Sequence, residues 1–285
     1  MFLIIKLIRM KHWIKNLFVF IPLLVSGNIF DAVLLYKSII IFFVFSFTSS
    51  SVYIFNDLVD IELDKLHPKK KNRPLANGTI SVSLANSIAA FLLASALLLL
   101  YLNNFDGVFP VLLYLTMNIL YSLYLKNLAL FDIFSISLGF VLRVFAGLAV
   151  TSLSSSFWLI SLTFTLSLLL ATGKRRHELV FSETISSRPS LSNYSLKFLE
   201  SAQTMFANLV ITFYVMYTFF NENFTGNHIL LMYSSGFVLA GILRYMQVNF
   251  SQNSIEEPTD ILYLDKFLLT IILLWALTII LAYQF

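Results

Sequence analysis

The residues best suited to chemistry lie in a short acidic stretch, NDLVDIELD, that begins at Asn56. If the apolar segment before it continues as an α-helix, Asp57, Asp60 and Asp64 point to one side within about 60° of each other, and Glu62 points elsewhere. Carboxylates spread over about two turns can hold one or two Mg²⁺ ions against a diphosphate, because Mg²⁺ prefers oxygen ligands and shares its coordination with phosphates. We therefore predict that these three aspartates, with the Asn56 amide beside them, bind magnesium and a diphosphate. The alternative is a solvated helix end whose acids pair with nearby lysines.

A basic turn follows the acidic stretch. The sequence KKKNRPLANGTIS places Lys70, Lys71 and Arg73 directly after the carboxylates. A guanidinium fixed by the proline that follows it can bind two phosphate oxygens at once, so Arg73 is a stronger candidate than the lysines. Gly78 permits the bend, and a hydroxyl group of the TIS that follows can cap the next helix. The lysines can equally serve as a positively charged anchor at the membrane surface.

The elements that must hold these residues are membrane-spanning. Apolar residues make up 58% of the 285 positions and charged residues 12%, and the mean hydropathy is +0.83. A soluble chain of this length needs far more polar surface than these residues can supply. The composition therefore predicts an all-α integral membrane protein.

About nine apolar segments are candidates for helices that cross the bilayer. All of the 19 Lys and Arg residues except Lys37 and Arg143 fall on the side of the amino terminus when these segments alternate across the membrane. The positive-inside rule then predicts a cytoplasmic amino terminus and, after nine spans, a carboxyl terminus outside. The first segment is short, and Pro22 can break it. The predicted spans are residues 17–30, 36–56, 83–102, 107–125, 130–151, 156–173, 199–220, 228–248 and 264–285.

The chain is predicted to form a single membrane domain over residues 1–285, because no Pro-, Gly- or Ser-rich linker divides it. Residues 2–12 are predicted to form an amphipathic helix at the inner interface. Two polar loops on the inner side, residues 57–82 and 174–198, are the candidate active-site loops. They follow the second and sixth spans, which would fit an internal duplication, although the sequence shows no convincing repeat.

Further polar residues lie in or beside the predicted spans. Arg143 interrupts an apolar run at a cost of about 2.5 to 3.5 kcal/mol on insertion scales, so an anionic group is expected to compensate it. That group is either a carboxylate, with Asp132 about three turns away on the same helical face, or a substrate phosphate. Lys15 and Asn16, at the inner end of the first span, are candidate phosphate contacts. Gly147, one turn after Arg143, is expected to allow close helix packing.

The acidic stretch and the basic turn together resemble the first signature of the UbiA-type intramembrane prenyltransferase superfamily, NDxxDxxxD followed by basic residues, RP and G.IS. The resemblance implies a UbiA-like helix bundle that holds a magnesium-bound diphosphate at Asp57, Asp60 and Asp64. The stretches MKHWIKNLFVFIPLL, YLKNLALFDIFSISLGFVLRVFAG, ATGKRRHEL and RYMQVNF…EEPTDILYLDK are similar to a phosphoribosyltransferase branch of that superfamily. This branch is implied to transfer 5-phosphoribose from phosphoribosyl diphosphate to a polyprenyl phosphate lipid and to release diphosphate.

The loop after the sixth span departs from the pattern of the superfamily. Members with aromatic acceptors carry a second aspartate motif there, whereas this chain has GKRRHEL. Lys174 and Arg175, with Glu178 beside them, are therefore candidates for binding a phosphate of the donor or the lipid, and a positively charged anchor is the alternative. A competing enzyme function, prenyl transfer from a polyprenyl diphosphate to an aromatic or lipid acceptor, would favour a usable second acidic motif. The non-enzymatic alternative is a cation-dependent transporter or lipid-binding protein, and a transporter more often has its site at the bilayer midplane.

The expected cofactor is Mg²⁺, and the expected partners are phosphoribosyl diphosphate, a polyprenyl phosphate and the bilayer of the bacterial cytoplasmic membrane. The formal charge of +4 reflects topology and not nucleic acid binding, because the basic residues lie beside spans. The absence of Cys excludes disulfide and thiolate chemistry, and the histidines lack partners at zinc-ligand spacing.

Overall fold

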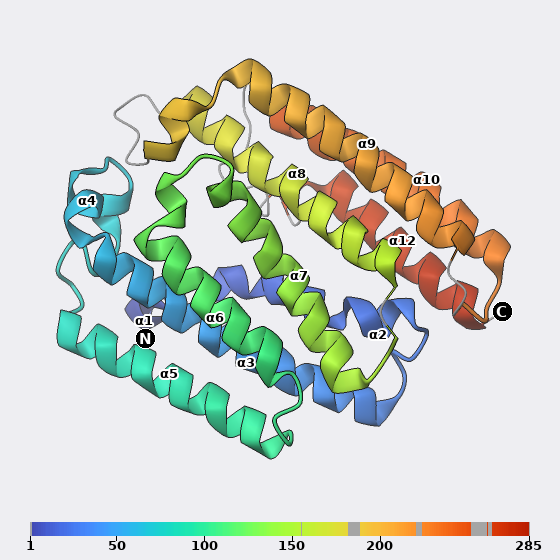
Figure 1. Cartoon of the computed structure of the whole chain (residues 1–285), viewed down its shortest axis with the longest axis horizontal. Coiled ribbons are helices and arrows are strands. Elements are labelled where there is room, and N and C mark those ends of the chain that lie inside the picture. Colours follow the sequence, from blue (N-terminus) through green and yellow to red (C-terminus); the bar gives the residue numbers. More distant parts are fainter. Residues whose placement is uncertain are drawn as a thin grey trace.

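Helices make up the regular structure of the chain, arranged as a bundle (Figure 1). The computed structural model describes residues 2–154, 156–181, 189–220, 224–251, 261 and 264–284. The α-helices are α1 (Phe2–Leu7), α2 (Ile21–Val25), α3 (Ala32–Val59), α4 (Ile61–Leu66), α5 (Val82–Leu102), α6 (Val108–Leu123), α7 (Phe131–Thr151), α8 (Phe157–Phe181), α9 (Leu196–Phe220), α10 (His228–Phe250) and α12 (Lys266–Gln284). Short 3₁₀ helices lie between them: η1 (Met10–Phe20), η2 (Lys70–Asn72), η3 (Leu125–Asn127) and η4 (Pro189–Asn193).

Seven of the described helices are long and apolar enough to cross a membrane: α3, α5, α7, α8, α9, α10 and α12. Helix α6 is also apolar but has only 16 residues. The first predicted span, residues 17–30, is not one continuous helix. The all-helical membrane fold is thus confirmed, whereas nine full spans are not.

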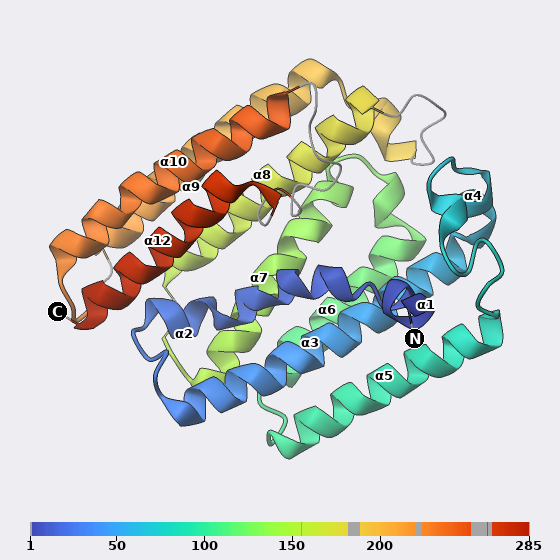
Figure 2. The ribbon, with the colours of Figure 1, turned by 180° about the vertical axis from the view of Figure 1, so that it is seen from behind.

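The chain enters the bundle through a broken segment in place of a straight first span. Helix η1 passes into α2, which has Pro22 in its first turn. Proline is tolerated in the first turn of an α-helix but interrupts a longer one. The amphipathic helix predicted over residues 2–12 is also shorter, because α1 ends at Leu7 and Arg9 adopts a left-handed conformation with φ of 51°. Figure 2 shows η1 crossing α3 and α7, against which it packs.

Helices α3 and α7 form the centre of the bundle. In their apolar windows 67% and 72% of the residues are buried, against 17% in α5 and in α12. Phe45 of α3 packs with Tyr114 of α6 and Ala146 of α7 in one apolar cluster. A second cluster joins α8, α9, α10 and α12 through residues such as Leu169 and Tyr245. Polar residues of these helices such as Ser46, Asp57 and Arg143 are therefore buried in the protein and do not contact lipid.

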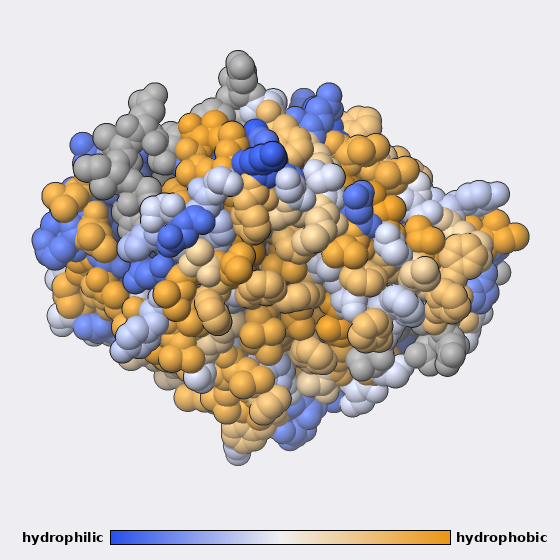
Figure 3. Space-filling view, turned by 45° about the horizontal axis from the view of Figure 1, so that its top comes forward, coloured by the Kyte–Doolittle hydropathy of each residue, from blue (hydrophilic) through white to orange (hydrophobic). Residues whose placement is uncertain are grey.

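The outer helices present apolar side chains to their surroundings. Phe91 of α5 and Leu273 of α12 are more than half exposed, and hydrophobic side chains cover most of the middle of the face in Figure 3. An exposed apolar belt of this kind is stable in a bilayer, where lipid tails cover it. The chain is therefore an integral membrane protein.

We expect replacement of Gly147 by Ala to destabilise the fold by about 1 to 3 kcal/mol, the usual cost of overpacking. A Cβ atom at Gly147 would overlap the carbonyl oxygen of Val19 in η1, which confirms the predicted close packing. The measurement is the free energy of unfolding in detergent. Gly236 in α10 is the matched control, because a Cβ atom there meets nothing within 4 Å, and its replacement by Ala should not destabilise. Equal stability of the two variants would contradict the packing of η1 on α7.

Candidate functional site

The acidic motif spans a break between two helices. Helix α3 ends at Val59, and Asp60 lies between α3 and α4 with φ of −97° and ψ of 6°. The expectation of one continuous helix through the motif is therefore wrong at one residue, and Asp60 binds a different cation from the other two acids. Asp57 and Asp64 are each 3% exposed and still face the same partner, because the chain continues as a helix after a single irregular residue.

That partner is Arg73. Its Nη1 atom lies 3.0 Å from Oδ1 of Asp57 and 2.5 Å from Oδ2 of Asp64. Arg73 follows directly after η2, and the turn then continues to Gly78, which has φ of 74°, and to Ser81, whose side chain caps α5. The guanidinium thus faces the carboxylates, as the order of residues in the turn indicated.

Lys126 binds the third carboxylate. Its Nζ atom lies 2.5 Å from Oδ1 of Asp60, and its side chain is only 10% exposed. The Asn56 amide donates to the other oxygen of Asp60 at 3.2 Å. The sequence indicated Lys126 only as one more basic residue of an inner loop. Its position in the short connection between α6 and α7 was the one feature that could have marked it as a site residue.

Arg9 is a second residue that sequence reasoning missed. Its Nη2 atom lies 2.5 Å from Oδ1 of Asp57, the same oxygen that Arg73 binds. The guanidinium also lies 4.9 Å from the ring centroid of Tyr53. Lys6 of α1 donates to the backbone oxygen of Asn72 at 3.0 Å. The amino-terminal segment is therefore fastened to the carboxylate site at two points.

The turn between α4 and α5 places the remaining lysines. Nδ1 of His67 accepts the backbone N–H groups of Lys69 and Lys70. Burial, with the charge of Lys70 nearby, lowers the pKa of His67, which keeps this nitrogen an acceptor. Lys70 is partly exposed and Lys71 is exposed, so both lysines can reach a ligand that enters from the water side.

The donor atoms at this site fit magnesium. Among the described residues no group of three or more possible ligands lies close enough together to hold a metal ion. Each carboxylate instead pairs with an arginine or lysine side chain. Asp57 and Asp64 nevertheless lie close enough together to bind the same nitrogen of Arg73. Two carboxylates that converge on one positive centre provide hard oxygen ligands of the kind that Mg²⁺ prefers, and Asp60, paired with Lys126, is a third carboxylate of the same motif.

A second polar cluster lies where the start of α7 meets the end of α8. Asp132 is fully buried and accepts hydrogen bonds from Tyr194 at 2.6 Å and Ser190 at 3.2 Å. Nε of Arg175 lies 2.7 Å from Asp132, but off the line of its N–H bond, so this contact is an ion pair without a hydrogen bond. Arg175 also bonds Glu178. Burial and the hydrogen bond to Asp132 raise the pKa of Tyr194, which favours its protonated, donating form.

Arg175 therefore faces protein carboxylates and has no exposed side-chain surface. Its neighbour Arg176 bonds Glu200 at 3.0 Å and the backbone oxygen of Asn249 at 2.8 Å. Lys174 is partly exposed at the same end of α8. The rest of the predicted loop over residues 174–198 lies in part outside the described residues, as does most of the EEPTDILY stretch.

Arg143 is not paired with a carboxylate, the first of the two expected partners. Its Nε atom donates to Asn16 at 2.7 Å, and its other nitrogens donate to the backbone of Gly139 and to Tyr114. Aromatic rings, including that of Phe45 at 5.7 Å, surround the guanidinium. The expected partner Asp132 is bound to Arg175 instead. Asn16 is fully buried and also bonds Ser46 and Ser49.

Lys15, next to Asn16, is partly buried. Because Asn16 bonds Arg143 and two α3 serines, η1 is anchored deep in the bundle, and Ser49 lies about two helical turns along α3 from Asp57. The Arg143 cluster is thus separate from the carboxylate cluster and supports the broken first segment.

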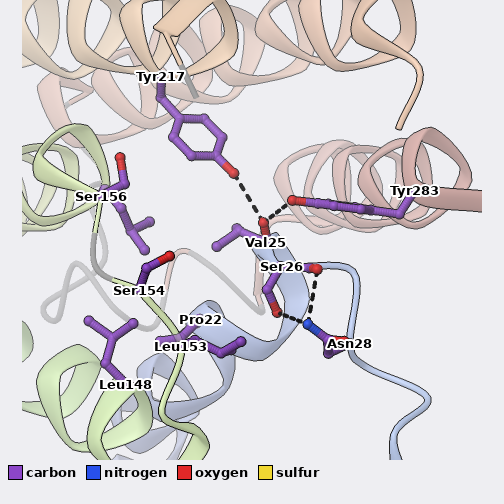
Figure 4. A pocket seen from close by; sticks show the side chains of 11 residues that line it. Pro22, Val25, Ser26, Asn28, Leu148, Leu153, Ser154, Ser156, Tyr217 and Tyr283 are labelled. Carbon is purple, nitrogen blue, oxygen red and sulfur yellow. Dashed lines mark hydrogen bonds between the residues drawn. The ribbon is translucent and has the colours of Figure 1, made fainter. Parts of the chain in front are cut away.

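A cavity of about 150 Å³ lies at the other end of the bundle, between α2, α7, α8, α9 and α12. The hydroxyl groups of Tyr217 and Tyr283 both donate to the backbone oxygen of Val25 at its edge (Figure 4). None of its 11 lining residues is charged. This cavity has no charged group that would bind an anionic phosphate.

The chain is similar to known proteins along nearly its whole length. Residues 17–182 match the model of the UbiA prenyltransferase family. The chain is 31% identical to the decaprenyl-phosphate phosphoribosyltransferase of Mycobacterium tuberculosis (strain ATCC 25618 / H37Rv), over 97% of this chain and 92% of that protein. It is also 31% identical to the protein of that name from Corynebacterium glutamicum, over 98% of this chain and 86% of the relative.

Solved structures agree on the fold. A UbiA homologue from Archaeoglobus fulgidus bound to GPP and Mg²⁺ has a TM-score of 0.73 at 18% identity, with 99% of both chains covered. The same homologue bound to Cd²⁺ has a TM-score of 0.72 at 17% identity, again over 99% of both chains. The family match and the full-length relatives show that this chain belongs to the UbiA prenyltransferase family and is a transferase of that superfamily.

Proposed function

We propose that this transferase moves 5-phosphoribose from phosphoribosyl diphosphate to a polyprenyl phosphate lipid and releases diphosphate. The observation that carries the proposal is the similarity, over 97% of the chain, to relatives named decaprenyl-phosphate phosphoribosyltransferase. Those names supply both the transferred group and the lipid acceptor.

The end of α8 supports this choice over prenyl transfer. Prenyl transfer would favour a second acidic motif at this position, whereas GKRRHEL has three basic residues and one acid. Arg175 and Arg176 also bond the neighbouring carboxylates of Asp132, Glu178 and Glu200. Arg175 and Asp132 then act as a fixed structural pair that positions the end of α8, and Lys174 remains the candidate phosphate contact of this loop.

Asp57, Asp60 and Asp64 would hold Mg²⁺, with Asn56 as a further oxygen donor. When bound, the ion would stabilise the negative charge of the diphosphate leaving group. Arg73 and Lys126 already point at these carboxylates and can donate to phosphate oxygens of the donor. Lys70 and Lys71 add positive charge at the mouth of the site.

The transfer itself needs no general base. The bond between the anomeric carbon of the ribose and the diphosphate oxygen breaks, and its electron pair leaves with the diphosphate. An oxygen of the lipid phosphate attacks the same carbon from the opposite face and forms the new bond. Because this nucleophile is already anionic, the described site can act by orientation and by charge stabilisation alone.

The bilayer determines how the lipid approaches. The distribution of basic residues supports a cytoplasmic position for the carboxylate end of the single domain, in the bacterial cytoplasmic membrane. The polyprenyl tail would lie between apolar helices while its phosphate reaches the site from the membrane boundary. The water-soluble donor, phosphoribosyl diphosphate, would enter from the cytoplasm.

The test is a pair of transfer assays on the purified protein with Mg²⁺. One contains labelled phosphoribosyl diphosphate and polyprenyl phosphate, and the other contains a labelled prenyl diphosphate and an aromatic acid. We expect label to enter a lipid product in the first assay only, and expect EDTA to abolish it and excess Mg²⁺ to restore it. Product only in the second assay would retain the diphosphate site and refute the proposed donor.

A further inference from the structure

Arg9 shares an oxygen atom with Arg73. Both guanidinium groups bind Oδ1 of Asp57, at 2.5 Å and 3.0 Å. The oxygen lies on a side chain that is 4% exposed, so water can do little to stabilise it. A metal ion can coordinate this oxygen only if at least one of the two arginines moves away.

Each carboxylate of the described site is paired with a cation. Asp57 contacts Arg9 and Arg73, Asp64 contacts Arg73, and Asp60 contacts Lys126. A divalent cation alone must break at least one of these ion pairs. A diphosphate alone meets cations that are already paired. When both ligands arrive, the carboxylates can bind the metal and the released cations can bind phosphate oxygens.

Arg9 is the cation of this set best placed to move. It contacts a single carboxylate oxygen, and its side chain is 20% exposed, against 10% for Lys126 and 26% for Arg73. It lies between α1 and η1 in a left-handed backbone conformation that few residues other than glycine adopt. Arg73, in contrast, bridges Asp57 and Asp64 and is fixed in the turn before α5.

We propose that Arg9 is a donor-binding residue: it holds Asp57 when the site has no ligand and moves to the diphosphate when Asp57 binds the metal. Metal and diphosphate then bind with positive coupling, each tightening the other by the same factor. The inference rests on the part of the proposed function that assigns a metal and a diphosphate to the three aspartates. It is independent of which group the diphosphate carries.

Equilibrium dialysis of the purified full-length protein with Mn²⁺ and inorganic diphosphate tests the coupling. For the wild type we expect the affinity for Mn²⁺ to rise by about tenfold or more when diphosphate is added. Arg9→Gln should bind Mn²⁺ alone more tightly than the wild type does, because Asp57 loses a competing cation. The gain from diphosphate should shrink at least about threefold in this variant, because one phosphate contact is lost.

Lys65→Gln is the matched control. It also removes one positive charge from this end of the protein, but Lys65 is 48% exposed and pairs with Glu62, so both affinities should stay within about twofold of the wild type. The proposal would be overturned if diphosphate raised the Mn²⁺ affinity of Arg9→Gln by the same factor as in the wild type. It would also be overturned if the Mn²⁺ affinity of the wild type did not change when diphosphate is added. Arg9→Met, which keeps the apolar stem of the side chain, is a second variant and should show the same two changes. Failure to bind Mn²⁺ with or without diphosphate would instead refute the metal site itself. Intact coupling in a protein that does not transfer phosphoribose would refute only the assignment of phosphoribosyl diphosphate as the donor.

Discussion

Replacement of Asp57 by Asn should lower kcat/KM for phosphoribosyl transfer by about 100-fold to 1,000-fold, the usual effect of removing one preorganised charge-stabilising group. The amide preserves the shape of the side chain but lacks the charge that a magnesium ligand supplies. Asp57 is also the carboxylate that both Arg9 and Arg73 contact. The measurement is the initial rate of label transfer to lipid at several donor concentrations.

Glu62→Gln is the matched control for Asp57→Asn. Glu62 lies in the same acidic stretch, but its side chain is 83% exposed and pairs with Lys65. Its neutralisation should leave kcat/KM within about twofold of the wild type, because exposed ion pairs contribute little. If both variants lose activity equally, the general charge of the loop matters and the specific position of Asp57 does not. If Asp57→Asn retains more than a tenth of the activity, the residue does not hold the metal.

Replacement of Arg175 by Met should destabilise the protein by about 3 to 5 kcal/mol, the cost of leaving a buried charge without its partner. Arg175 and Asp132 have no exposed side-chain surface, so water cannot stabilise the carboxylate once the guanidinium is removed. Tyr194 and Ser190 would still donate to Asp132, but neither carries a positive charge. Unfolding in detergent with increasing denaturant, followed by tryptophan fluorescence, measures the change.

Arg244→Met serves as the control for Arg175→Met. Arg244 also bonds a carboxylate, that of Asp265 at 2.8 Å, but at a solvent-accessible position, so its loss should have only a small effect on stability. In the folded fraction of Arg175→Met, the KM for the donor should change far less than the stability does. A large increase in KM with unchanged stability would show that Arg175 contacts a substrate phosphate.

The difference between Arg175 and Arg73 shows how far the sequence reasoning reached. Both follow a predicted span, and both were candidates for binding phosphate. Arg73 does face the carboxylates, because the turn that holds it is short and its geometry is set by neighbouring residues. Arg175 points instead at a residue on another helix, and no local pattern in the sequence indicates which helix that is.

The break at Asp60 illustrates a second limit. Helical periodicity placed the three aspartates on one face, but α3 ends before Asp60, and Asp60 binds Lys126 whereas Asp57 and Asp64 bind Arg73. Hydropathy likewise identified an apolar segment near the amino terminus but could not show that it is a 3₁₀ helix followed by a short α-helix. Both 3₁₀ and α-helices bury apolar side chains, so composition does not distinguish them.

The sequence by itself determined that this is a helical membrane protein and identified the acidic stretch and the basic turn that follows it. These features depend on composition and on residues close together in the chain. Only the tertiary structure decided that Arg9 and Lys126 bind the carboxylates, that Arg143 bonds Asn16, and that Arg175 pairs with Asp132. The physical reason is that periodicity shows which residues share a face of one helix, whereas the packing of helices against each other determines which faces meet.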